Sequence, residues 1–436
     1  MGEPRLTTLA EAEAYLAGFI NLERVTAFPY AKLGLARIDA LLAALGSPHA
    51  DLPCVHIAGS KGKGTVAYAT EALLRAAGRR VATYTSPHLE SWLERYRIDG
   101  ADVTEAALLD GLAVVAPAAE KLRADPALRP SFFDVSTALA LVLFRQAGVD
   151  VGVIEVGLGG RLDSTNRVAS RVSVITSIQL EHTDKLGTTH EAIATEKAGI
   201  LRQGARALHG PLCAEALGAV MARAVAEDVE LDEVVAECVS HAPDGLVARL
   251  ADGREVAASV VGRHQVHNVA LAIRAAECFL GRELRASELG ALRTLVLPGR
   301  FEWRGDVLID CAHTPDAVRA LRASIAELYP GRGIVAVVAI SRDKDAATML
   351  TELAAETRAC FTCAPEPDRS MAPTELEALA WACGVASVQA CASTEVALTR
   401  AVSAALPGDL VLVTGSSYLA GAVRGILRRE RRDPVS

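Results

Sequence analysis

The chain has 436 residues, of which 51% are apolar, and a formal net charge of −8. This length exceeds one ordinary domain and can bury more than one hydrophobic core. The acidic balance makes general nucleic-acid binding a poor expectation, and no segment has the roughly 18 uninterrupted apolar residues of a membrane span. The nine cysteines are scattered, and the single CxxC at Cys360–Cys363 lies in an apolar run without a second pair. With no signal-peptide layout at the start, these features predict a cytoplasmic protein without disulfides or a structural zinc.

Apolar runs of strand length alternate with longer helical segments along most of the chain. The predicted strands are Cys54–Ala58, Val81–Thr85, Val151–Val156, Val172–Ser177, Val307–Ile309, Ile334–Ile340 and Leu410–Val413. Alanine-rich segments with a helical period lie between them, for example Val66–Ala77, Val135–Gln146 and Ala317–Leu328. Alternation of this kind predicts right-handed βαβ units, and therefore an α/β fold with mostly parallel sheets covered by helices.

A glycine-rich turn follows the first predicted strand, in the sequence CVHIAGSKGKGT that ends at Thr65. Glycines let backbone N–H groups surround a polyphosphate, while Lys63 and the start of a helix supply positive charge. Lysine is scarce in this chain, yet Lys61 and Lys63 both lie in this turn. The turn departs from the P-loop pattern because Gly64 separates Lys63 from Thr65. The simpler alternative is a turn that only packs a helix onto a sheet.

Chemically useful side chains lie at or just after the ends of three other predicted strands. Ser86 lies in TSPHL, Glu155 begins EVGLGGRLD, and His182 lies in LEHTD. Because parallel strands point their carboxyl ends to one edge of a sheet, these residues are expected at a common binding edge. A buried carboxylate at Glu155 would need a cation, which a metal or a basic side chain can supply.

Each of these residues also has an ordinary interpretation. Ser86 before a proline is typical of a helix N-cap, and Glu155 can form an ion pair with Arg161. His182 can be a hydrogen-bonded loop residue. Lys197, beside a glutamate in ATEKAGI, can lie on a solvated helix face. The order of these residues and their repeated place after strands favour a shared site.

Two changes in pattern suggest a division of the chain. Residues 228–261 contain short apolar runs and turns such as APDG and ADGRE, which predict a small antiparallel excursion. A Pro-Gly pair at Pro298–Gly299 then interrupts the helical pattern and indicates a linker. We therefore predict an N-terminal domain over residues 1–297, with the glycine-rich loop at 59–65, and a C-terminal domain over residues 298–436.

Taken together, the motifs resemble the folylpolyglutamate synthase/dihydrofolate synthase family, within the Mur-type ATP-dependent amide ligases. The similar segments run in order from residue 56 to residue 421: HIAGSKGKGT, TSPHL, ERYRIDG, SFFDVSTALA, EVGLGGRLDSTN, HTDKLGTTHEAIATEKAGI, GRHQVHNVALA, PGRFE, DCAHTPDA and GSSYLAG. The resemblance implies a P-loop mononucleotide-binding domain followed by a smaller Rossmann-like domain, with ATP in the cleft between them.

The resemblance also implies a reaction. An acceptor carboxylate, from dihydropteroate or from the terminal glutamate of a folate, attacks the γ-phosphate of ATP and forms an acyl phosphate. The amine of L-glutamate then displaces phosphate and forms an amide. The implied cofactors are ATP and Mg²⁺, with two metal ions, and a monovalent cation; the implied state is a monomer without nucleic-acid or membrane partners.

Site residues follow from the resemblance position by position. The phosphates of ATP would be held by Gly59, Gly62, Lys63, Gly64 and Thr65. Further nucleotide contacts would come from Asn268, Arg300, Asp310 and His313. Mg²⁺ would be held by Ser86, Glu155, His182 and Lys197 as a carbamate, and the catalytic groups would be Lys63, Glu155, His182 and Lys197. The pterin pocket would be lined by Ser131, Phe132, Phe133, Asp134, Leu162, Asp163 and Ser164.

Four positions depart from the pattern expected of bacterial members, at Lys61, Glu181, Cys311 and Thr314. They keep every implied metal or phosphate ligand and leave the acceptor open. Alternatives are a Mur-type amide ligase acting on a different carboxylate, and a P-loop NTPase that uses hydrolysis as a conformational switch.

Overall fold

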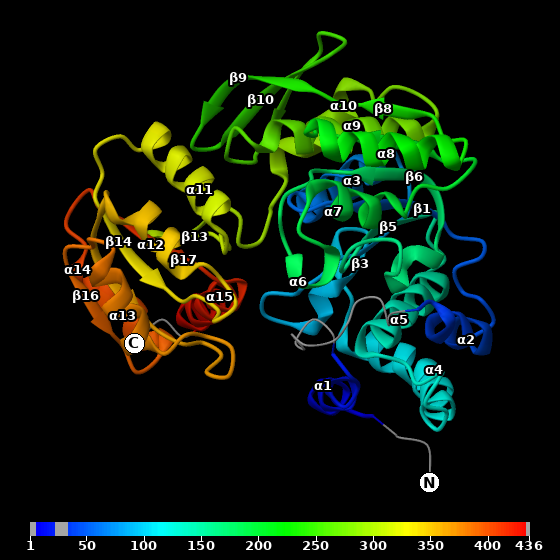
Figure 1. Ribbon diagram of the computed structural model, residues 1–436, viewed down its shortest axis with the longest axis horizontal. Helices are drawn as coiled ribbons and strands as arrows, with labels where there is room; N and C mark the ends of the chain where they lie inside the picture. The colour runs from blue at the N-terminus through cyan, green and yellow to red at the C-terminus, as the bar shows by residue number, and fades with distance from the viewer. Residues whose placement is uncertain (1–5, 22–33, 433–436) are drawn as a thin grey trace.

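The computed structural model describes residues 6–21 and 34–432, which form two lobes built on separate sheets (Figure 1). The larger sheet has eight strands in the order β4-β3-β2-β5-β1-β6-β7-β8. Its strands are β1 (Pro53–Ala58), β2 (Val81–Tyr84), β3 (Tyr96–Ile98), β4 (Ala101–Asp102), β5 (Val151–Glu155), β6 (Ala169–Ile175), β7 (Arg206–His209) and β8 (Leu231–Glu233). From β2 to β8 neighbouring strands are parallel, whereas β3 and β4 add an antiparallel edge.

Both faces of this sheet are covered, and successive side chains of the central strand enter the cores on opposite faces. Val55 and Ile57 of β1 belong to a core with helices α3 and α9, whereas Cys54 belongs to the core on the opposite face. The helices of this lobe are α1 (Leu9–Ala17), α2 (Ala36–Ala44), α3 (Lys63–Ala76), α4 (Glu105–Arg123), α5 (Phe132–Ala147), α6 (Thr183–Leu186), α7 (His190–Ala198), α8 (Ala214–Ala226), α9 (Gln265–Leu280) and α10 (Ala286–Leu289). Three short 3₁₀ turns, η2 (Trp92–Arg95), η3 (Ser164–Arg167) and η4 (Gly290–Thr294), complete the lobe.

A three-stranded antiparallel sheet packs on α9 and reaches toward the second lobe (Figure 1). It consists of β9 (Ala236–Ala242), β10 (Gly245–Leu250) and β11 (Glu255–Ala258). Buried apolar residues of β10 and β11 join the core formed by α3 and α9. The short strands therefore extend one face of the first lobe.

The second lobe has six strands in the order β12-β13-β17-β14-β15-β16, antiparallel between β12 and β13 and parallel elsewhere. They are β12 (Glu302–Arg304), β13 (Val307–Ile309), β14 (Ile334–Val338), β15 (Thr357–Thr362), β16 (Val388–Ala390) and β17 (Leu410–Thr414). Its helices are α11 (Pro315–Leu328), α12 (Ala346–Ala354), α13 (Pro373–Ala382), α14 (Thr394–Ala404) and α15 (Ser417–Arg432). The first three share one core, whereas α14 and α15 cover the other face.

The α/β class predicted from the sequence is confirmed, as a mostly parallel sheet followed by a smaller α/β sheet. Register brings the predicted strand ends together, because Ile57 of β1 pairs with Glu155 of β5 and with Val174 of β6. Among the described residues, no helix combines the length and apolar content needed to cross a bilayer.

Candidate active site

The glycine-rich turn joins β1 to α3 and has no room for side chains at two of its glycines. Gly62 has φ +88°, and a Cβ there would lie 2.3 Å from Asn268 Oδ1. A Cβ at Gly59, where φ is +147°, would lie 1.9 Å from Thr176 Oγ1. The turn is thus held between the end of β6 and the start of α9, with its backbone close to both. This is the steric requirement of a loop that presents backbone N–H groups to a ligand.

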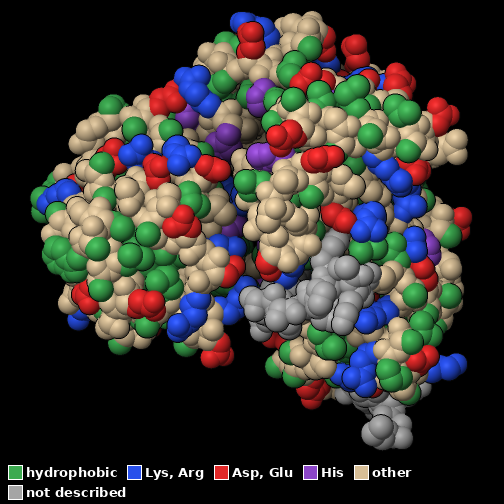
Figure 2. All heavy atoms as spheres, in the orientation of Figure 1, with side chains coloured by type: hydrophobic (Ala, Val, Ile, Leu, Met, Phe, Trp, Pro, Cys, Tyr) green, Lys and Arg blue, Asp and Glu red, His purple; other side chains and the backbone are tan. Residues whose placement is uncertain are grey.

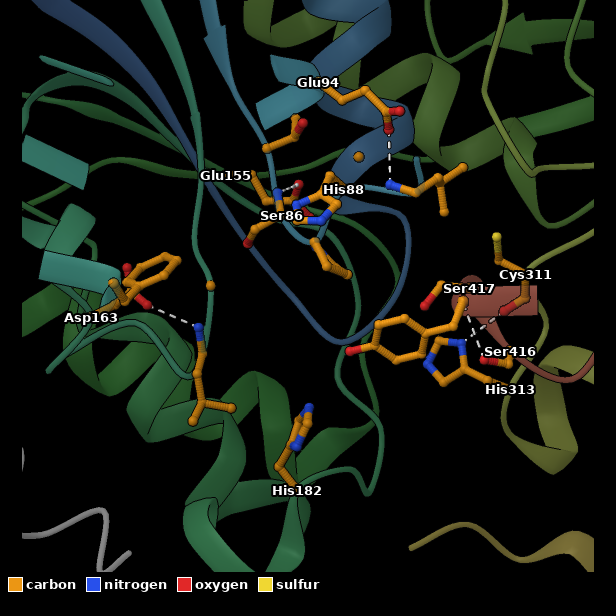
Figure 3. A pocket seen from close by; sticks show the side chains of 18 of the residues that line it. Ser86, His88, Glu94, Glu155, Asp163, His182, Cys311, His313, Ser416 and Ser417 are labelled. Carbon is orange, nitrogen blue, oxygen red and sulfur yellow. Dashed lines mark hydrogen bonds between the residues drawn. The ribbon is translucent and has the colours of Figure 1, made fainter. Parts of the chain in front are cut away.

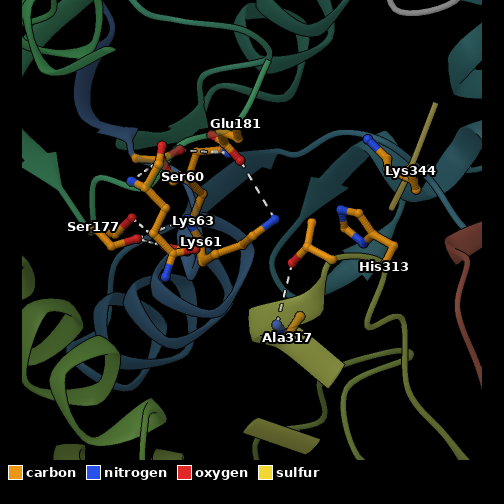
Figure 4. A network of polar contacts seen from close by, with 12 residues as sticks. Ser60, Lys61, Lys63, Ser177, Glu181, His313, Ala317 and Lys344 are labelled. Carbon is orange, nitrogen blue, oxygen red and sulfur yellow. Dashed lines mark hydrogen bonds and ion pairs between the residues drawn. The ribbon is translucent and has the colours of Figure 1, made fainter. Parts of the chain in front are cut away.

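Three lysines gather around this turn and one glutamate (Figure 4). Lys63 Nζ donates a 2.9 Å hydrogen bond to Gly59 O, and Lys197 Nζ donates to the same oxygen at 3.0 Å. Lys197 also donates to Glu181 Oε1 at 3.0 Å, while Lys61 Nζ lies 3.6 Å from Glu181 Oε2. One carboxylate among three lysines leaves positive charge beside the turn, and an anion is its natural complement.

Burial and neighbouring charges shift the pKa values of Lys197 and Glu181. The Lys197 side chain is only 3% exposed. Burial lowers its pKa to about 8, although the neighbouring Glu181 carboxylate opposes that shift. Burial also raises the pKa of Glu181, but the attraction of Lys197, Lys63 and Lys61 outweighs it and brings that pKa to about 2. The solvated helix face considered for Lys197 is therefore excluded.

Glu155 ends β5 beside the same turn, and its carboxylate is buried. Its Oε2 accepts a 3.1 Å hydrogen bond from the backbone N–H of Ser86 and would lie 4.0 Å from a Cβ at Gly64. Burial raises the pKa of Glu155, while Lys63 and the Ser86 N–H oppose that shift. Arg161, considered as an alternative partner, forms its ion pair with Glu196 at 2.7 Å. No helix begins at Ser86, so its interpretation as an N-cap is also excluded.

A cavity of about 360 Å³ opens in front of these groups and receives residues from both lobes (Figure 3). From the first lobe it is lined by Gly64, Thr65, Ser86, Ser131, Phe133, Asp134, Glu155, Leu162, Asp163, Ser164 and His182; from the linker and second lobe it is lined by Arg300 and His313. A smaller hollow shares His182 with it and is lined by Gly59, Lys63, Glu181 and Lys197. In Figure 2 the surface is hollowed between the lobes, where basic and histidine side chains gather.

Hydrogen bonds stiffen one wall of the cavity. Asp134 accepts from the Ser131 hydroxyl and the Ser164 hydroxyl, each at 2.7 Å. Asp163 accepts from the Leu158 N–H at 2.9 Å and from the Thr165 hydroxyl at 2.5 Å. Because these carboxylates are satisfied within the protein, the wall has a defined shape before any ligand binds.

Besides Gly62 of the glycine turn, three predicted site residues line neither the cavity nor the smaller hollow. Phe132 turns into the core, where its ring meets that of Trp92 edge-on, with the ring centroids 4.8 Å apart. Asn268 lies behind the glycine turn, where its side-chain amide donates to Gln265. Asp310 accepts from two backbone N–H groups, of Phe301 and Ala312, each at 2.8 Å. These side chains support the loops of the site rather than its surface.

His313 is prepared for one protonation state by its own loop. Its Nδ1 lies 2.8 Å from the carbonyl oxygen of Cys311. A carbonyl only accepts, so Nδ1 carries a proton. Burial lowers the pKa of His313 to about 3, so the ring is neutral and Nε2 keeps its lone pair. His313 thereby offers an acceptor at the second-lobe side of the cavity.

Comparison with known proteins shows the family to which this chain belongs. A model of the Mur ligase, glutamate ligase domain matches residues 299–417. The folylpolyglutamate synthase of Lacticaseibacillus casei is 34% identical over 414 residues, which cover 90% of this chain and 94% of that protein. The chain belongs to the folylpolyglutamate synthase/dihydrofolate synthase family. A probable bifunctional folylpolyglutamate synthase/dihydropteroate synthase of Halobacterium salinarum is 37% identical over 405 residues, or 90% of this chain; this chain spans about half of its length, 49%.

Solved structures of the family share the whole arrangement. The Mycobacterium tuberculosis folylpolyglutamate synthase complexed with ADP and AMPPCP has a TM-score of 0.86 and 31% identity, covering 96% of this chain and 98% of that one. E. coli FolC in complex with DHPP and ADP has a TM-score of 0.84 and 30% identity, covering 99% and 100%.

The family resemblance assigned site roles to only part of the cavity wall, although some of the remaining lining residues lie in similar segments such as TSPHL and GSSYLAG. The additional lining residues, from both lobes, are Gly34, Arg37, Tyr68, Thr85, Pro87, His88, Leu89, Glu94, Gly157, Leu158, Lys185, Leu297, Pro298, Cys311, Ser341, Asp343, Lys344, Arg369, Ser416, Ser417 and Tyr418. The segments 341–344 and 416–418 follow β14 and β17, so the strand-end rule used for the first sheet would have found them in the second.

Glu181 was noticed in the sequence only as a departure from the bacterial pattern. Its role in the lysine cluster depends on tertiary contacts with Lys61 and Lys197.

The donor groups suit magnesium better than a softer metal. Within residues 6–21 and 34–432, no three His, Cys, Asp or Glu side chains gather into a metal-holding group. Mg²⁺ is commonly bound through one or two carboxylates, waters and substrate phosphates. The Glu155 carboxylate and the Ser86 hydroxyl beside the glycine turn fit that pattern.

Proposed function

We propose that this protein is an ATP-dependent ligase that adds L-glutamate to the carboxylate of a folate or a dihydropteroate through an acyl phosphate. The observation that carries the proposal is the cavity in which the glycine turn and Glu155 of one lobe face Arg300 and His313 near the other. Relatives named as folylpolyglutamate synthases over most of the chain, and neighbours complexed with ADP, support it.

Charge is the main obstacle that this reaction presents to a protein. The acceptor carboxylate and the triphosphate repel each other, so the site must neutralise both before they react. Lys63 and the N-terminus of α3 lie where the phosphates would bind, and Arg300 adds a guanidinium at the linker. We assign them to holding the nucleotide, and the stiff wall around Asp134 and Asp163 to holding the acceptor.

Magnesium would be held by Ser86, Glu155 and His182, and when bound it neutralises charge on the transferring phosphoryl group. Lys197 would join this set as a carbamate. The depressed pKa of Lys197 supports that assignment, because the neutral amine is the form that adds to CO₂. The adduct would replace an ammonium, which repels a metal ion, with an anionic oxygen donor.

A direct test supplies the purified protein with ATP, Mg²⁺ and L-glutamate, and with dihydropteroate or tetrahydrofolate in separate reactions. Mass spectrometry should show an acceptor that has gained one glutamyl residue, with ADP formed only when acceptor and glutamate are both present. The variant Glu155→Gln should lose this activity. Glu352→Gln, which removes a carboxylate from an exposed ion pair with Arg319, should keep it.

Two other outcomes would redirect the assignment. Transfer to neither folate acceptor, with ATP turnover induced by another carboxylate, would favour a Mur-type ligase of different specificity. ATP hydrolysis that is independent of glutamate would favour a P-loop NTPase switch.

A further inference from the structure

A short segment of the first lobe is embedded in the second. The loop after β2 begins with Ser86 and continues to Leu89 and Glu90. Leu89 packs against the core formed by β13, β17, α14 and α15. Its backbone approaches α15 so closely that a Cβ at Gly421 would lie 1.9 Å from Leu89 O. The loop that carries the proposed magnesium ligand Ser86 is therefore anchored in the opposite lobe.

Glu90 anchors this segment through charge. Its Oε1 accepts a 2.8 Å hydrogen bond from Arg424 Nε, and Arg428 lies 3.2 Å from Oε2 as an ion pair. The Glu90 side chain is 9% exposed and that of Arg424 is 11% exposed. The same Arg424 guanidinium also contacts Glu302 of β12. Two buried carboxylates from different lobes thus share one arginine, an arrangement in which removing one partner leaves an uncompensated charge.

Both carboxylates of this ion cluster, Glu302 and Glu90, belong to segments that connect directly to the cavity wall. Glu302 Oε2 accepts a 2.7 Å hydrogen bond from the N–H of Gly299, and the next residue, Arg300, lines the cavity. On the other side, the cavity residue Glu94, labelled in Figure 3, accepts from backbone N–H groups. The donors are Leu89, Glu90 and Ser91, at 2.8–3.0 Å. The segment is consequently stiff, so displacement at Glu90 is transmitted along the loop.

We propose that Glu90 is a positioning residue, whose ion cluster with Arg424 and Glu302 fixes the two loops at the mouth of the cavity relative to each other. Its predicted effect on activity rests on the proposed function, because one loop carries Ser86 and the other carries Arg300. Glu90 itself touches neither substrate nor metal. It sets the distance between a metal-binding group of one lobe and a nucleotide-binding group at the linker.

The chain offers a matched control in a second ion cluster between the lobes. Glu327 of α11 pairs with Arg263, its Oε2 2.9 Å from Arg263 Nε, and with His241 Nδ1 at 3.1 Å. This cluster joins the same two lobes but involves none of the residues that line the cavity. Glu327→Gln therefore removes a more exposed ion pair between the lobes, with Glu327 34% exposed, without touching either cavity loop.

Hydrogen–deuterium exchange of the ligand-free protein tests whether Glu90 holds the loop after β2 in place. Glu90→Gln should accelerate exchange in the peptide covering residues 85–91, whereas Glu327→Gln should leave that peptide as in the wild type. Equal exchange in the two variants would overturn the proposal. If Glu90→Gln does not fold, Arg424→Lys takes its place, since it keeps the charge but loses the planar fork that contacts both Glu90 and Glu302; unchanged exchange at 85–91 in that variant would overturn the proposal equally.

Kinetics test the functional part. Glu90→Gln should raise the Mg²⁺ and ATP concentrations needed for half-maximal glutamyl transfer about tenfold, because the groups that bind them are displaced. Glu327→Gln should change both by less than about twofold. Arg424→Gln should raise both concentrations at least as much as Glu90→Gln, because it also removes this arginine from Glu302. Combining the two substitutions should give less than the sum of their effects, since the two residues act as one unit. Additive effects, or equal effects of Glu90→Gln and Glu327→Gln, would refute positioning by Glu90. Absence of glutamyl transfer in the wild type would instead refute the proposed function, and the exchange comparison would still decide the role of the loop.

Discussion

Helix α3 is flanked by two glycines with similar positive φ angles, Gly62 before it and Gly78 two residues after it, which allows a sharp test of the glycine turn. Gly62 has φ +88° and Gly78 has φ +82°. A Cβ at Gly62 would lie 2.3 Å from Asn268 Oδ1 and 2.8 Å from Asn268 Cγ, whereas a Cβ at Gly78 would meet nothing within 4 Å. Both substitutions, Gly62→Ala and Gly78→Ala, therefore strain the backbone. Only Gly62→Ala also creates a steric clash.

The expected magnitudes follow from those distances. An alanine in the left-handed region costs about 1–2 kcal/mol at either position. At Gly62 the clash adds about 1–3 kcal/mol of overpacking, because the Asn268 amide must leave its 2.7 Å hydrogen bond to Gln265. We expect Gly62→Ala to destabilise the protein by about 2–5 kcal/mol, and Gly78→Ala by about 1–2 kcal/mol.

Urea unfolding measures both changes, and calorimetric titration with a non-hydrolysable ATP analogue measures binding. Affinity should fall at least about tenfold in Gly62→Ala, which corresponds to about 1.4 kcal/mol, because the turn must move away from Asn268. Gly78→Ala, at the far end of the helix, should bind the analogue as the wild type does. Equal stability and equal affinity in the two variants would refute the inferred packing of the turn and its role in nucleotide binding.

Three further predictions concern pH, the buried lysine and closure of the lobes. Burial lowers the pKa of His56 to about 3 from the ordinary 6.5, so the unfolded chain takes up a proton there before the folded protein does. Stability should therefore fall as pH drops below 6.5, by about 2 kcal/mol at pH 5; urea unfolding of His56→Gln should lack this component, and an unchanged pH slope would contradict it. Native mass spectrometry in bicarbonate should detect one CO₂ adduct that Lys197→Ala loses and that a variant of an exposed lysine on α4, Lys121→Ala, keeps. Metal-dependent activity should be lost in Lys197→Ala alone, and full activity of Lys197→Ala would exclude the carbamate. Small-angle scattering should show compaction when ATP and folate are added, as the lobes close about residues 298–300, and an unchanged radius of gyration would argue against closure.

Much of the fold was predictable because its signals are local. Alternating apolar runs and helical periods predicted the central strands β1, β2, β5 and β6 of the larger sheet and β13, β14 and β17 of the smaller one, but not the strands toward the edges. Parallel sheets follow from strands joined by helices. The predicted strand at Val172–Ser177 differs from β6, which begins at Ala169 and ends at Ile175. The start of β6 is polar and partly exposed, so periodicity does not mark it.

The sequence by itself determined the glycine turn and the polar residues at strand ends, because backbone freedom and strand direction depend on neighbours along the chain. Tertiary structure alone decided which side chains meet. It turned Phe133 to the cavity and the adjacent Phe132 into the core, and it buried Lys197 against Glu181. It also brought Glu90 to Arg424, a pair separated by 334 positions. Contacts of this kind depend on how the two lobes pack together, and no local pattern encodes that packing.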